Sequence, residues 1–95
     1  MIIIFESQKG NFSARAEYSK EKIVLLKNSI ISNKKYNCKI SLKIEQMRKD
    51  KNLIQNNVLQ RDLQFNSLSS MAEFVSGYKA NGLRVWKTED GKKIK

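Results

Sequence analysis

The chain has 95 residues, of which 40% are hydrophobic and 29% charged, and its 19 Lys and Arg against 9 Asp and Glu give a formal net charge of +10. This length fits one domain, and the hydrophobic content excludes an unstructured charged tail. Histidine is absent and cysteine occurs once, which excludes an imidazole base, a zinc site of several Cys or His, and an internal disulfide.

The first part of the chain predicts three consecutive antiparallel strands. Residues 2–5 form a short apolar run, typical of a strand buried on both faces. Residues 12–18 alternate apolar and polar side chains, as in a strand with one solvent-exposed face, and residues 23–26 predict a third strand. The run at 2–5 is too short for a signal peptide or a membrane span, so we expect a cytoplasmic protein without a membrane partner.

The spacing of apolar residues becomes helical in the middle of the chain and predicts an amphipathic helix over about 41–52. Its apolar positions are Ile40, Ile44, Met47 and Ile54. The other side carries four cations, Lys43, Arg48, Lys49 and Lys51. These cations form either a second basic surface or an ordinary solvated helix face. Asn56-Asn57 is expected to end the helix, and residues 58–65 predict a strand or an extended segment.

The C-terminal third predicts a second helix and a hairpin. Ser67 is a good N-cap, and Gly77 is expected to end the helix in the left-handed conformation. The apolar stripe of this helix consists of Leu68, Met71, Ala72 and Val75. Asn81-Gly82 predicts a tight turn, residues 83–88 a strand, and Asp90-Gly91 a turn into a short strand at 92–94.

These elements predict an α+β fold in which a small, mostly antiparallel sheet of about five strands accompanies two helices. We expect a single basic domain over residues 1–95. No cofactor is expected, because the glycines form neither a dinucleotide fingerprint nor a phosphate-binding loop. The carboxylates also lack the clustered spacing of a magnesium nuclease, so we expect a protein that is not an enzyme.

The charge distribution favours a polyanionic partner. Residues 34–51 carry seven cations against two acids, and residues 79–95 carry six against two. Binding such a surface to nucleic acid releases condensed counterions. The codon bias of an AT-rich genome toward Lys and Asn explains the same surplus without any function. A partner that is DNA or another nucleic acid is the leading hypothesis.

Residues 65–91 carry a specific pattern in one order: Phe65, Ser67, Ser69, Ala72, Gly77, Asn81-Gly82, Trp86-Lys87 and Asp90-Gly91. It resembles a bacterial domain family of unknown function that is found C-terminal to GIY-YIG nucleases and in restriction-modification-associated proteins. The pattern of that family runs Phe-x-Ser-Pro-Ser, an Ala-rich helix, Gly, Asn-Gly, Trp-Lys and Asp-Gly. Leu68 stands here in place of Pro, and Asn28 in place of an upstream Gly, and both replacements are structurally mild.

The resemblance implies an accessory role in a bacterial DNA-processing or restriction-type system, without a nuclease part in this chain. The predicted function is therefore non-catalytic nucleic-acid binding. The alternative is a protein-interaction or oligomerisation module that docks a nuclease or methylase subunit, through strand 2–5 or the final hairpin. A small enzyme that uses Cys38 or a serine is a third, disfavoured hypothesis, because no partner base accompanies the thiol.

Candidate contacts with nucleic acid lie in the C-terminal module, with Arg84 and Lys92 preferred for phosphate. The full set is Ser67, Ser69, Tyr78, Lys79, Asn81, Arg84, Lys87, Lys92 and Lys93. The two serine hydroxyls either bind a phosphate at the helix N-terminus or only cap the helix. Asn81 either sets the turn geometry or contacts a ligand. Trp86 is expected in the core rather than stacked on a base.

Overall fold

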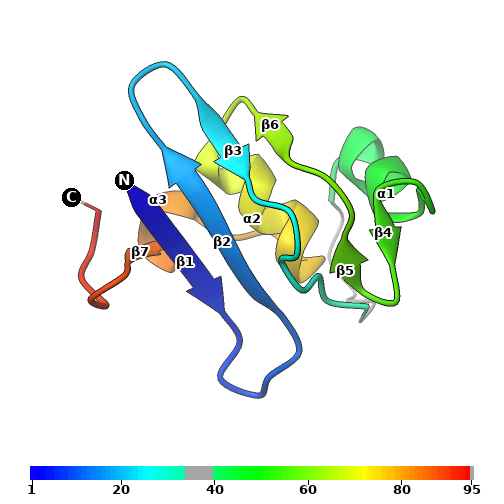
Figure 1. Ribbon diagram of the computed structural model, residues 1–95, viewed down its shortest axis with the longest axis horizontal. Coiled ribbons are helices and arrows are strands. Elements are labelled where there is room, and N and C mark those ends of the chain that lie inside the picture. The colour runs from blue at the N-terminus through cyan, green and yellow to red at the C-terminus, as the bar shows by residue number, and fades with distance from the viewer. Residues whose placement is uncertain (34–39, 95) are drawn as a thin grey trace.

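The computed structural model describes residues 1–33 and 40–94, and its N-terminal half forms the predicted meander (Figure 1). The strands are β1 (Ile2–Glu6), β2 (Ser13–Tyr18) and β3 (Ile23–Leu25). β1 and β2 pair antiparallel from Ile2 opposite Glu17 to Glu6 opposite Ser13, and β2 pairs with β3 in the same manner. The three strands predicted in this half of the chain are thus confirmed.

Two later strands complete the sheet. β6 (Leu63–Phe65) pairs with β3, and β7 (Lys87–Thr88) pairs with β1, which gives a five-stranded antiparallel sheet in the order β6-β3-β2-β1-β7. The extended segment predicted at 58–65 is interrupted: it contains β5 (Val58–Leu59), which forms a separate hairpin with β4 (Ile54–Gln55), and then β6. The turn residues of this hairpin, Asn56-Asn57, both have positive φ, as a tight two-residue connection requires.

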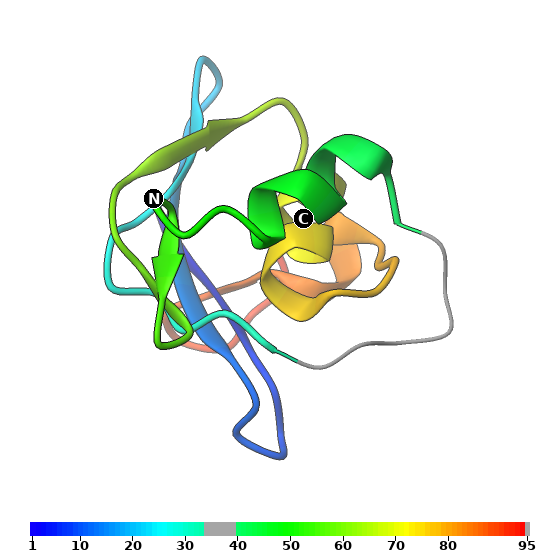
Figure 2. The same ribbon diagram turned by 90° about the vertical axis from the view of Figure 1, so that its right-hand side faces the viewer.

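Three helices, α1 (Leu42–Arg48), α2 (Leu68–Ser76) and α3 (Gly82–Val85), lie on the same face of the five-stranded sheet (Figure 2). The fold is therefore α+β, as predicted. Among the described residues no second layer covers the opposite face, which we call the open sheet face. The prediction that strand 2–5 is buried on both faces is consequently wrong, because Ile2 and Ile4 point to the open sheet face and are only half-buried.

The core fills the space between the sheet and α2. Trp86, Phe74 and Ile3 are completely buried there. The rings of Phe5 and Trp86 meet edge to face with their centroids 5.6 Å apart, a favourable aromatic geometry. The expectation that Trp86 belongs to the core is confirmed. Within the described part of the chain, no helix has the length and apolar character needed to cross a membrane.

The region after α2 differs from the prediction. Asn81-Gly82 does not form the predicted tight turn before a strand but starts α3, because the Asn81 side chain accepts a hydrogen bond from the backbone N–H of Leu83 at 3.1 Å. The strand predicted over 83–88 is reduced to β7. The turn at Asp90-Gly91 is confirmed: Gly91 has φ +84°, and its N–H bonds the Thr88 carbonyl.

The helix predicted over about 41–52 is shorter in the structure and ends at Arg48. The Asp50 carboxylate accepts a hydrogen bond from the backbone N–H of Asn52 at 2.8 Å. Such a local side-chain bond competes with helix continuation. Ile54 therefore lies in β4 rather than on the helix. Cys38, the residue of the disfavoured enzyme hypothesis, lies outside the described residues.

Candidate nucleic-acid interface

The two candidate serines are engaged within the protein. The Ser67 hydroxyl accepts a hydrogen bond from the backbone N–H of Ser70 at 3.0 Å and so caps α2. The Ser69 hydroxyl accepts one from the backbone N–H of Gly82, also at 3.0 Å, and ties α3 to the first turn of α2. This geometry accounts for both serines by structure, and a contact with phosphate stays a prediction.

Asn81 and Tyr78 also have structural surroundings. Asn81 caps α3, as described above. Tyr78 is half-buried and packs against the core, and its backbone N–H bonds the Ser76 hydroxyl. For both residues, a contact with nucleic acid stays a prediction.

The cations of the C-terminal module come from different surfaces. Lys79 lies in the loop between α2 and α3, and Arg84 lies on α3. Lys92 and Lys93 lie in the final hairpin, which follows β7 at the same end of the molecule as α3 (Figure 1). These four side chains are exposed. Lys87 pairs with Ile4 in the sheet and shares the open sheet face with it. Lys93 lies opposite Lys87 in an antiparallel bridge, so its side chain is on the open sheet face as well.

Carboxylates neutralise few of the described cations. Three ion pairs form among residues 1–33 and 40–94: Arg15–Glu89 and Lys49–Glu45 at 3.3 Å, and Lys92–Asp90 at 3.8 Å. All three are solvent-exposed, and such pairs hold their partners weakly. No carboxylate of the described chain forms an ion pair with Lys79, Arg84 or Lys93, so these charges are available to a polyanion.

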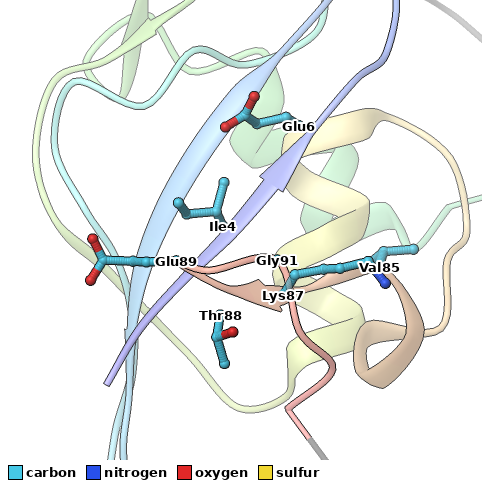
Figure 3. A pocket seen from close by; sticks show the side chains of 7 residues that line it. All are labelled: Ile4, Glu6, Val85, Lys87, Thr88, Glu89 and Gly91. Atoms are coloured by element: carbon cyan, nitrogen blue, oxygen red, sulfur yellow. The ribbon is translucent and has the colours of Figure 1, made fainter.

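The open sheet face carries charges of both signs. A shallow depression of about 260 Å³ lies between β1 and the segment that follows α3 (Figure 3). Its lining consists of Ile4, Glu6, Val85, Lys87, Thr88, Glu89 and Gly91. Glu17 of β2 also points to this face, because it pairs with Ile2. Among the described residues, the face thus presents three carboxylates (Glu6, Glu17 and Glu89) beside three cations (Arg15, Lys87 and Lys93), so it has no surplus of positive charge to attract phosphate.

Arg48 of the second basic surface has a structural role that the sequence analysis missed. Its guanidinium donates hydrogen bonds to the carbonyl oxygens of Phe74, at 2.5 Å, and Ser32, at 2.6 Å. It therefore joins α1 to the last turn of α2 and to the segment after β3. A signal was present in the sequence, because Arg48 lies four residues after the buried Ile44 and so on the inward side of α1.

A family model described as "Domain of unknown function (DUF4357)" matches residues 3–95 of the chain. The chain belongs to the DUF4357 family. No curated protein and no solved structure matches it. The resemblance to a domain family of unknown function is therefore confirmed and extends over nearly the whole chain.

In this DUF4357 domain, the residues that carried the resemblance mainly hold α3 against α2. Ser69 bonds Gly82 as described, and the Trp86 indole N–H donates to the Leu68 carbonyl oxygen at 3.1 Å. Upstream, Asn28 has φ +76°, in the left-handed region where the family pattern has Gly. The pattern thus reflects how the domain folds, and the ligand surface has to be sought in the exposed cations instead.

Proposed function

We propose that this DUF4357 domain is a non-catalytic, nucleic-acid-binding accessory domain that contacts the phosphate backbone of DNA. The observation that supports the proposal is the set of exposed cations without carboxylate partners in and after the α2–α3 region, in a chain of net charge +10. Such side chains neutralise phosphates and release counterions, which supplies most of non-specific DNA affinity.

The proposed surface is the helical side, formed by α1, α2, α3 and the loop between α2 and α3. Lys79 and Arg84 are its central contacts, and Lys92 adjoins it from the final hairpin. Lys87 is left out, because Glu6 and Glu89 line the same depression (Figure 3). The proposal also includes a role in a bacterial restriction-type system, which is based on the family resemblance alone. It includes a cytoplasmic location, which is based on the composition alone.

Two alanine variants test the surface, because Arg84 and Lys87 are close in sequence and each substitution removes one positive charge. Losing one phosphate contact reduces the steepness of log affinity against log salt by about 0.9. At 0.1 M salt this corresponds to an affinity about eightfold lower. We expect Arg84→Ala to show this loss in fluorescence anisotropy with labelled DNA. Lys87→Ala is expected to change affinity by less than about twofold.

Equal weakening of DNA binding by both variants would contradict the helical side as the binding surface, since net charge alone would then explain the binding. No binding of the unmodified domain to DNA at about 50 mM salt would end the nucleic-acid function itself. Thermal melting by circular dichroism checks that both variants remain folded.

The alternative is a docking module that uses strand 2–5 or the final hairpin. β1 is not an edge strand, because β2 and β7 pair with it on its two sides. This pairing disfavours the addition of a partner strand to residues 2–5. Docking through the final hairpin stays a prediction, and light scattering at high salt tests it, since an assembly of that kind persists when charges are screened.

A further inference from the structure

The described aromatic side chains offer no open stacking platform. The four phenylalanines and Trp86 are all at least 93% buried, since their relative exposure is 7% or less. Tyr18 and Tyr78 are half-buried and pack against the core. Proteins that hold single strands stack successive bases on exposed aromatic rings. Residues 1–33 and 40–94 lack this feature.

The helices are also poorly placed to enter a major groove. α2 has six buried residues out of nine and packs between α1 and α3. α3 has only four residues. α1 has seven, and the Glu45–Lys49 ion pair lies on its exposed side. Reading of base edges requires an element whose side chains reach the groove floor, and the described helices do not provide one.

We propose, on the basis of the function proposed above, that the ligand is duplex DNA, bound through its phosphates and irrespective of base sequence. The proposed contacts are the exposed cations of the helical side and the adjoining hairpin: Lys43, Lys79, Arg84 and Lys92. Duplex DNA has the higher charge density, and the logarithm of its affinity falls with log salt by about 0.9 per neutralised phosphate, against about 0.7 for a single strand. Over about four phosphates this difference amounts to a factor of about six at 0.1 M salt.

The test uses fluorescence anisotropy with the full chain and labelled oligonucleotides. Two duplexes of about 20 base pairs with unrelated sequences, and their separate strands, are titrated at several salt concentrations. We expect the duplexes to bind within about twofold of each other and about sixfold more tightly than the strands at 0.1 M salt. Tyr36, which lies outside the described residues, supplies the control: Tyr36→Ala is expected to leave duplex affinity unchanged.

Three other results would contradict the inference or the proposed function. Single strands that bind as tightly as the duplexes would overturn the duplex inference and leave nucleic-acid binding standing, above all if Tyr36→Ala then lowers the affinity for single strands. Duplexes that differ by more than about tenfold would overturn the independence from sequence. Absence of binding to every oligonucleotide would overturn the proposed function, and this inference with it.

Discussion

Gly82 lies where α3 meets the first turn of α2, and the space there admits no side chain. A Cβ at this position would lie 2.4 Å from the carbonyl carbon of Leu68 and 2.5 Å from the backbone nitrogen of Ser69. Both are backbone atoms, so they cannot swing aside as the end of a side chain does. The close approach also allows Ser69 to accept the Gly82 N–H and Trp86 to reach the Leu68 carbonyl.

We expect Gly82→Ala to lower the free energy of unfolding by about 3 kcal/mol, because the two backbones must move apart. Gly91→Ala is the matched control. Gly91 has φ +84° but open space around it, so only the left-handed conformation is penalised, by about 1 kcal/mol. Urea denaturation of both variants measures the difference. Equal losses would show that the contact between α2 and α3 tolerates a methyl group.

Local chemistry at single residues could be predicted from the sequence, whereas contacts between distant residues could not. The Ser67 cap and the left-handed Gly77 are confirmed, because each depends on backbone groups within a few residues. The role of Gly82 depends on α2, thirteen residues away in the case of Ser69. The pair Asn81-Gly82 is therefore recognisable in the sequence as an unusual backbone site, but the predicted tight turn is in fact the start of α3.

At the scale of elements, the alternation of Leu83 to Trp86 indicated a strand, and the structure has a helical turn. Four residues are too few to separate the two periodicities. The exposed Leu83 and the buried Trp86 do not decide for the helix either, because residues three apart also lie on opposite faces of a strand. The capping by Asn81 and the docking of Gly82 decide between them, which is a tertiary effect.

The attachment of α1 depends on Arg48, and this gives a prediction for the element. We expect Arg48→Met to lower the free energy of unfolding by about 2 kcal/mol, because the carbonyl oxygens of Phe74 and Ser32 lose a charged donor. Lys49→Met is the control on the same helix, since the Lys49 side chain is exposed and pairs with the exposed Glu45; its effect should stay within about 0.5 kcal/mol. If chemical denaturation gives similar values for both, Arg48 does not hold α1 in place.

At the scale of the whole molecule, the sheet has one covered face and one open face, and charge is divided between them. The sequence predicted the sheet and its antiparallel order because strand alternation is a local signal. To predict that Lys87 and Arg84 lie on different faces, one would need to know the register of β1 against β7, which is a contact between distant residues. The candidate cations could thus be listed from the sequence, but their division between two faces could not.

This division predicts how added positive charge acts on DNA affinity. Glu73 is a partly exposed residue of α2 on the helical side, and Glu17 is exposed on the open sheet face. Each Glu→Lys substitution changes the net charge by the same amount. We expect Glu73→Lys to tighten binding by up to about tenfold and Glu17→Lys by no more than about twofold in anisotropy titrations. A stronger effect of Glu17→Lys would place the DNA on the sheet.

Trp86 is the sole tryptophan of the chain, and it is sealed between α2 and the sheet with its indole N–H bonded to Leu68. Its intrinsic fluorescence therefore reports whether the core is intact. In the folded protein the indole is in an apolar environment, and its emission wavelength shifts when unfolding exposes it to water. The unfolding titrations of the variants can be followed by this signal without any attached dye. Because the ring does not reach the surface, oligonucleotides added to the solution meet no indole to quench, so binding and unfolding can be recorded as independent optical events.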